Sequence, residues 1–74
     1  MKIPIINMEK TGEKIIHYRK KAGISVKEIQ EIFGFTTPQA IYKWQHGTAL
    51  PTIDNLVTLA FLLNVTVDDI LVKD

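Results

Sequence analysis

The chain has no cysteine, only four glycines and three prolines, and no long hydrophobic run. The absence of cysteine excludes disulfide bonds and thiolate zinc sites, and it fits the reducing cytoplasm, where we expect the protein to be. The apolar run at residues 59–63 is far shorter than the roughly 20 residues that span a bilayer. The N-terminus has one lysine and a short apolar run broken by Pro4, which is too little for a signal peptide. These absences predict a soluble protein without a membrane partner.

Patterns that carry catalysis or bind metals are also missing. His17 and His46 are far apart and lack the acidic companions of a zinc site. Asp68 and Asp69 are adjacent, so on a helix they point in different directions. No glycine-rich phosphate loop and no serine nucleophile elbow is present. Because so small a body has no room for a deep pocket, we expect no enzyme activity, metal, cofactor or small-molecule ligand.

The chain does contain enough apolar side chains for one small core, at 46% of 74 residues. Its net charge is only +1, but the charge is unevenly distributed. Residues 1–47 carry eight lysines and arginines against four glutamates, whereas residues 48–74 carry one lysine against four aspartates. A positive half of this kind suits a nucleic-acid partner. We expect residues 1–10 to form an N-terminal arm or a short edge strand, and residues 11–74 to form one domain.

Apolar periodicity and helix-end signals predict five short helices and no sheet, which is an all-α fold class. The first helix should start at about Thr11 and stop at Gly23. The second should be capped by Ser25, in a capping box with Glu28, and stop at Gly34.

Similar signals delimit the last three helices. The third helix should have Pro38 at its first position and Thr37 as its cap, and should run to about Gln45. Thr52 should cap a fourth helix that runs to about Leu63, and Thr66 a fifth that holds Val67, Ile70 and Leu71. The side chains predicted to form the core are Ile15, Ile29, Phe33, Ile41, Trp44, Leu56, Leu59 and Ala60.

Residues 25–47 read as two amphipathic helices joined by a glycine-containing turn. In the second helix, Ala40, Ile41 and Trp44 recur at helical spacing and should face inward. Its other face carries hydrogen-bond donors, one cation and no acid, on Gln39, Tyr42, Lys43 and His46. A DNA major groove accepts a short helix whose inner face is buried in the protein and whose outer face carries long polar side chains.

The span from Thr11 to Leu71 resembles the phage-repressor and Cro-like (Xre-type) helix-turn-helix domains. Four segments carry the resemblance: R-K-K-A-G-I-S at 19–25, I-x-K-W-x-x-G at 41–47, L-P-T-I-D-N-L-x-x-L-A at 50–60 and L-N-V-T-V-D-D-I-L at 63–71. The resemblance implies a repressor-like transcriptional regulator with a helix-turn-helix at about 26–45. Residues 38–45 would be the recognition helix.

The resemblance also implies roles for single residues. The expected base contacts are Gln39, which suits adenine, Lys43, which suits guanine, and Tyr42, which could meet a thymine methyl group or a phosphate. The expected phosphate contacts are Ser25, Lys27, Thr37, His46 and Thr48. Arg19 corresponds to a buried arginine that relatives pair with a glutamate, so Arg19 and Gln45 are expected to form a structural pin.

The chain departs from the family pattern at four points. Val26 stands where many relatives have a phosphate-binding glutamine, and Gln30 where they have alanine. The turn after Gly34 is one residue longer than usual. Gln45 replaces the glutamate that would neutralise Arg19. These departures should change how the first helix docks on the DNA backbone.

Two function classes follow from the sequence. The first is a DNA-binding regulator that acts as a homodimer, because one recognition helix contacts too few bases for a tight specific site. The second is a protein-interaction module, such as an antitoxin or a regulator subunit. The apolar C-terminal third exceeds what one small core needs, which suggests a partner surface. Its simplest partner is a second copy of the chain, and a different protein is the alternative.

Overall fold

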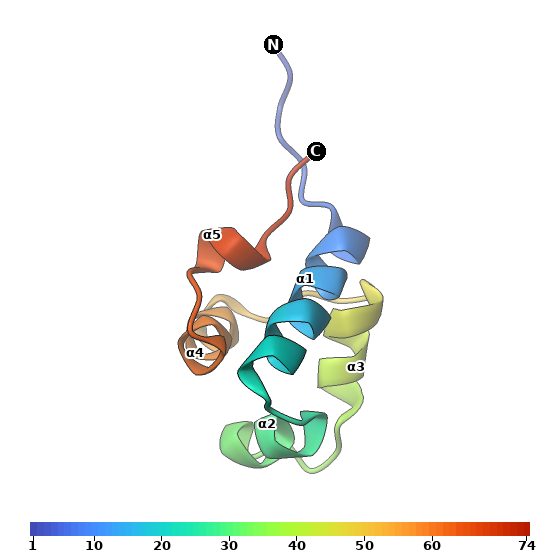
Figure 1. The fold of residues 1–74 in the computed structure, drawn as a ribbon. Helices are drawn as coiled ribbons and strands as arrows, with labels where there is room; N and C mark the ends of the chain where they lie inside the picture. The colour runs from blue at the N-terminus through green and yellow to red at the C-terminus, as the bar shows by residue number, and fades with distance from the viewer.

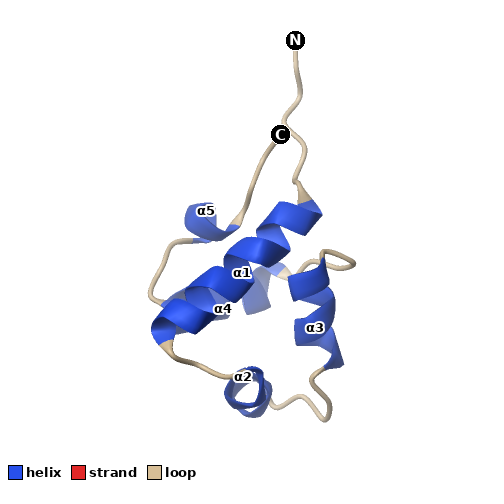
Figure 2. Cartoon of the chain, turned by 45° about the vertical axis from the view of Figure 1, so that its right-hand side comes forward, coloured by secondary structure: helices blue, strands red, loops and turns tan.

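The computed structural model describes residues 1–74 and contains five helices (Figure 1): α1 (Met8–Ala22), α2 (Val26–Phe33), α3 (Gln39–His46), α4 (Ile53–Leu63) and α5 (Val67–Ile70). The remaining residues form turns, loops and termini, with no strand (Figure 2). The prediction of an all-α fold with five helices is confirmed. None of these helices has both the length and the apolarity that crossing a membrane requires.

Most helix ends lie where the capping residues predict them. The Ser25 hydroxyl accepts a hydrogen bond from the Glu28 N–H at 3.0 Å, and the Glu28 carboxylate accepts one from the Ser25 N–H at 3.1 Å. Thr66 and Asp69 form the same reciprocal pair at the start of α5, whereas Thr52 caps α4 only by accepting a hydrogen bond from the Asn55 N–H at 3.3 Å. Asn64 ends α4 in the left-handed region, at φ 58°. These bonds satisfy backbone groups that a helix end otherwise exposes.

Three predicted boundaries are wrong. The helix α1 begins at Met8 rather than at about Thr11, because the Asn7 side chain accepts a hydrogen bond from the Lys10 N–H at 2.9 Å and caps it. The helix α3 begins at Gln39, with Pro38 as its N-cap residue and no capping bond from Thr37. Leu71 lies outside α5, since its backbone is extended.

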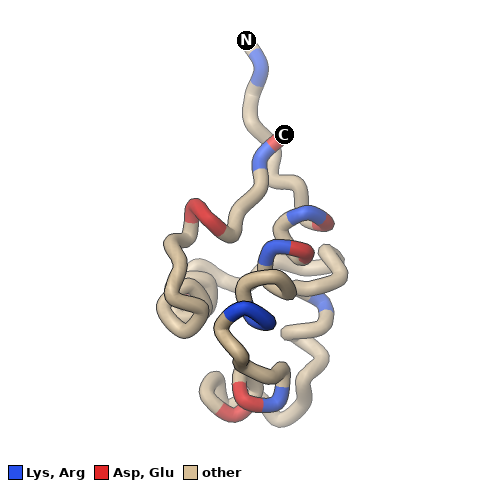
Figure 3. Tube along the Cα trace, in the orientation of Figure 1, with Lys and Arg blue, Asp and Glu red and all other residues tan.

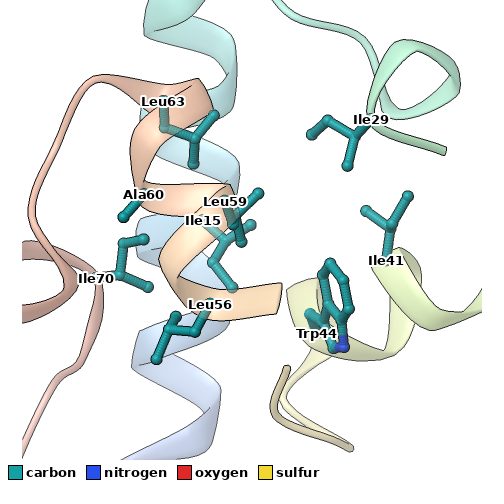
Figure 4. Packing of buried hydrophobic residues seen from close by; sticks show 9 residues of the cluster. All are labelled: Ile15, Ile29, Ile41, Trp44, Leu56, Leu59, Ala60, Leu63 and Ile70. Carbon is teal, nitrogen blue, oxygen red and sulfur yellow. The ribbon is translucent and has the colours of Figure 1, made fainter. Parts of the chain in front are cut away.

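The core forms where α1, α3, α4 and α5 meet, with α2 closing one end through Ile29 (Figure 4). Seven of the eight predicted core residues are buried, and Phe33 is only partly buried. Two further apolar side chains, Leu63 and Ile70, complete the buried cluster. Prediction missed Ile70 because its helix has only four residues, too few to show a period.

The two termini run side by side. The Asn7 N–H donates to the Val72 carbonyl at 2.7 Å, and the Asp74 N–H donates to the Ile5 carbonyl at 2.8 Å. Between them Ile6 and Lys73 form an isolated antiparallel bridge. The first residues then project from the helical body (Figure 1). The division into an arm at 1–10 and a domain at 11–74 stays a prediction.

Candidate nucleic-acid interface

The turn between α2 and α3 is held by one glutamine. Gly34 ends α2 in the left-handed region, and the Phe35 N–H donates to the Gln30 carbonyl at 3.0 Å. The Gln30 side-chain amide in turn donates to the Phe35 carbonyl at 3.2 Å. Gln30 therefore binds both backbone groups of Phe35, and alanine at this position could form the backbone bond but not the side-chain bond. The longer turn and the unusual glutamine are two parts of one local structure.

Aromatic packing supports the same turn from the inside. The rings of Phe33 and Phe35 stack with centroids 5.4 Å apart, and both meet the Trp44 ring edge-on at 5.8 and 5.9 Å. Such pairs add about 0.5–1.5 kcal/mol beyond the area they bury. The cluster spans α2, the turn and α3, and it holds α3 against α2 through Trp44.

The inner face of α3 lies very close to α1. Ile41 and Trp44 are buried as the helical spacing predicts. Gly12 of α1 lies beneath the end of α3, where a Cβ atom would overlap the Gln45 carbonyl and lie 2.6 Å from the Trp44 carbonyl oxygen. Only glycine permits this approach, and no sequence signal pointed to it.

Arg19 and Gln45 make the contact that the resemblance implied. The Arg19 Nε donates to the Gln45 side-chain oxygen at 3.0 Å, and its Nη1 donates to the Ile24 carbonyl at 3.0 Å. Gln45 is only 8% exposed, so the bond is shielded from water. The guanidinium ties the end of α1 to α3 with hydrogen bonds alone, without a carboxylate.

The outer face of α3 is open to solvent. Gln39, Tyr42, Lys43 and His46 are all exposed. Gln39 and Lys43 are four residues apart, so they are neighbours on one side of the helix, about one turn from each other. The rings of Tyr42 and His46, also four apart, lie roughly parallel with centroids 6.4 Å apart. The three side chains expected to contact bases thus lie on one exposed helix that carries no acid.

The residues expected to contact phosphate differ in their available donors. Lys27 and Thr37 are exposed and make no hydrogen bond through their side chains, and His46 is exposed. The Ser25 hydroxyl accepts a capping bond but keeps its hydrogen for a further acceptor. The Thr48 hydroxyl donates to the Lys43 carbonyl at 3.3 Å, so it must give up this bond before it can donate to a phosphate. The side chains of Ser25, Lys27, Thr37 and His46 are therefore better placed to contact phosphate than that of Thr48.

The charges around this face are mixed. Acidic residues lie on α2 as well as on α5, whereas α3 carries one lysine and no acid (Figure 3). No group of His, Cys, Asp and Glu could hold a metal ion. Beside the acids of α2, this face offers hydrogen-bond donors on α3, exposed helix starts and a few cations, which is the chemistry that recognises phosphate and base edges.

Comparison with known families gives one match. A helix-turn-helix family model matches residues 15–70, which is most of the chain and includes both helices of the motif. Searches of curated proteins and of solved structures found no significant match.

Proposed function

The chain belongs to the Xre/Cro-like helix-turn-helix family, and from this premise we propose that it is a repressor-like transcriptional regulator that binds a specific DNA sequence as a homodimer. The family is a DNA-binding one. The observation that carries the finer proposal is the outer face of α3, where Gln39, Tyr42 and Lys43 are exposed on a helix whose other side is fully packed.

In this proposal α3 enters the major groove. Gln39 reads adenine through its amide, and Lys43 reads the acceptor atoms of guanine. The groups that hold the protein on the DNA backbone are the Lys27 ammonium, the Thr37 and Ser25 hydroxyls and His46. Val26 cannot donate a hydrogen bond, so Lys27 and the N-terminal N–H groups of α2 take over the contact at this point.

The dimer follows from the size of one recognition helix. An eight-residue helix covers only a few base pairs, and two copies that read half-sites one helical turn apart give the affinity and symmetry of an operator.

Selection of bound sequences from a random DNA pool tests the proposal. We expect an inverted repeat whose half-sites are centred about 10 base pairs apart. Recovery of no enriched sequence would contradict sequence-specific binding, and it would favour a protein-interaction module. Enrichment of a single unrepeated half-site would keep specific DNA binding and contradict the dimer.

A further inference from the structure

Three large apolar side chains on α4 are exposed to solvent, although α4 also contributes to the core. Ile53 is 80% exposed, Val57 56% and Phe61 82%. They are spaced by four residues, so they form one stripe along the whole helix, which we call the α4 stripe. The α4 stripe is about 12 Å long, measured along the helix axis from Ile53 to Phe61. The buried residues of α4 occupy the neighbouring side of the helix, so the apolar surface continues from the core out into solvent.

From the α4 stripe we infer that the homodimer forms by antiparallel packing of α4 against α4 of a second copy, with Val57 next to the two-fold axis. The inference rests on the proposed dimeric function, and it names the surface that this function needs. It also assigns a role to apolar residues that the fold leaves uncovered.

The symmetry of the α4 stripe favours a second copy as the partner. Ile53 and Phe61 stand four residues on either side of Val57. A two-fold rotation about Val57 therefore places the partner's Ile53 against Phe61, and the reverse pair at the other end. Phe61 also borders a shallow hollow lined by Ala60, Asn64 and Val65. The partner's Ile53 would lie against this hollow.

Charge favours the same partner and the same orientation. Asp54 is the only charged residue on α4, so the helix offers nothing to attract a strongly charged protein. In an antiparallel pair the two Asp54 carboxylates would be separated by about 9 Å along the helix axes, whereas in a parallel pair they would face each other. Like charges side by side would oppose the parallel arrangement.

The α4 stripe is also separate from the DNA-binding face. None of its residues lies on α2 or α3, so two copies joined through α4 keep both recognition helices uncovered. Its exposed area is roughly 300–400 Å² per copy, about half of what a standard stable interface buries from each partner. We therefore expect a weak dimer in solution, with a dissociation constant on the order of 10 µM or weaker, which a two-site operator would stabilise.

Sedimentation of the full chain over a range of concentrations tests the surface. Phe61→Lys should weaken self-association more than tenfold, because it places a charge inside the apolar contact. Thr58→Lys is the matched control, since Thr58 is exposed on the same helix outside the α4 stripe, and it should leave self-association unchanged. Phe61 makes little contact with the core, so circular dichroism should show both variants folded.

Cross-linking tests the orientation. The natural chain has no cysteine, so Val57→Cys introduces a single thiol beside the proposed axis and should give a disulfide-linked dimer on mild oxidation. Thr58→Cys should give little disulfide-linked dimer under the same conditions. A wild-type chain that stays monomeric both at several hundred micromolar and on operator DNA would overturn the inference. So would equal cross-linking by the two variants.

Failure of this inference can be distinguished from failure of the DNA-binding proposal. Lys43→Ala should weaken DNA binding and leave sedimentation unchanged. Phe61→Lys should reduce binding to a two-half-site operator while a single half-site is bound as the wild type binds it. If Lys43→Ala and Phe61→Lys both dimerise as the wild type does and only Lys43→Ala loses DNA binding, the proposal of DNA recognition by α3 is kept. The α4 stripe is then not the dimer surface.

Discussion

At the scale of single residues, the closest constraint in the molecule is Gly12. It lies inside α1, where alanine would ordinarily stabilise the helix by about 1 kcal/mol. Here the backbone carbonyls of Trp44 and Gln45 occupy the space that a Cβ atom would need. The position of α3, and with it the recognition face, depends on this missing methyl group.

We predict that Gly12→Ala lowers the free energy of unfolding by about 1–3 kcal/mol, as insertion of a methyl group into a tightly packed site does. Chemical denaturation measures the change. Gly23→Ala is the comparison, because a Cβ atom there meets nothing within 4 Å and the cost, about 1–2 kcal/mol, comes only from the left-handed backbone. Stabilisation by Gly12→Ala would mean that α1 and α3 are not in close contact.

The Arg19–Gln45 bond lacks a counter-charge, so Gln45→Glu should stabilise the fold. A charge-assisted bond would replace a neutral acceptor, adding about 1 kcal/mol at pH 7. The guanidinium would lower the pKa of the new carboxyl in the folded state. The added stability would therefore be complete above the unfolded pKa of about 4.3 and lost as pH falls through the folded value.

Thermal unfolding of Gln45→Glu at pH 7 and at pH 3 checks this sign. Gln30→Glu is the matched control, since it makes the same substitution at another glutamine whose side chain is hydrogen-bonded. Gln30 donates its amide hydrogen to the Phe35 carbonyl, and a carboxylate has no hydrogen to donate. Gln30→Glu should therefore lower the melting temperature at pH 7. A lower melting temperature for Gln45→Glu at pH 7 would contradict the pairing.

The proposed base contacts predict that Gln39→Ala and Lys43→Ala each weaken specific DNA binding by about 1–3 kcal/mol and leave the melting temperature nearly unchanged. Both side chains are exposed, so little folding energy is lost. Fluorescence anisotropy with the selected operator measures the effect. Lys14→Ala is a charge-matched control, because Lys14 is on α1, outside the helix-turn-helix, and near Asp69 of α5. An equal loss with Lys14→Ala would point to general charge rather than base recognition.

At the scale of the elements, short helices depend on their ends. The four-residue α5 has little intrinsic stability, but Thr66 and Asp69 satisfy each other's backbone N–H groups, at 2.9 and 3.1 Å. Two hydrogen bonds with Thr66 hold the pKa of the Asp69 carboxyl below its usual value, and the bond with the Thr66 backbone has the larger effect. This cap keeps Ile70 in the core.

Asp69→Ala should therefore lower the melting temperature at pH 7. Because the folded pKa is lowered, the carboxylate contributes stability above the unfolded pKa of about 3.9, and that contribution disappears as pH falls through the folded value. The difference between wild type and variant should thus shrink below about pH 4. Asp68→Ala removes a charge from the same turn without breaking the cap, and it should have the smaller effect at pH 7. Equal effects would show that only the helix dipole matters.

At the scale of the whole molecule, the α4 stripe lies outside the part of the chain in which cations predominate. Lysine and arginine outnumber the acids in the residues up to the end of α3. Beyond it, α4 and α5 carry aspartates, and α4 also carries the α4 stripe. One side of the chain can therefore meet phosphates while another meets a second copy. Neither role requires the other surface to change.

We predict that DNA affinity falls steeply with salt. If each protomer of a dimer neutralises about two to four phosphates, the logarithm of the binding constant should fall against the logarithm of salt concentration with a slope between roughly −4 and −7. Anisotropy titrations from low to physiological salt measure it. A slope near zero would favour the alternative, a protein-interaction module whose main contacts are apolar.

The sequence by itself determined the features that depend on neighbours a few residues away. Ser25 with Glu28, and Thr66 with Asp69, specify helix starts through local bonds. The period of Ile41 and Trp44 determined which side of α3 is buried, and so which residues it presents outward. Apolar periodicity did not predict the early start of α1, which depends on the capping bond that Asn7 accepts from the Lys10 N–H.

Only the tertiary structure decided the contacts between distant segments. The need for glycine at position 12 arises from carbonyls more than thirty residues away in the sequence. Gln30 looked like a departure from the family until the path of the turn brought the Phe35 carbonyl to its amide. Most α4 residues are apolar, and packing against α1 and α5 determined which of them are covered and which form the exposed α4 stripe. The sequence shows which residues of a helix are apolar. How much of that apolar surface becomes buried depends on where the other helices of a small core lie.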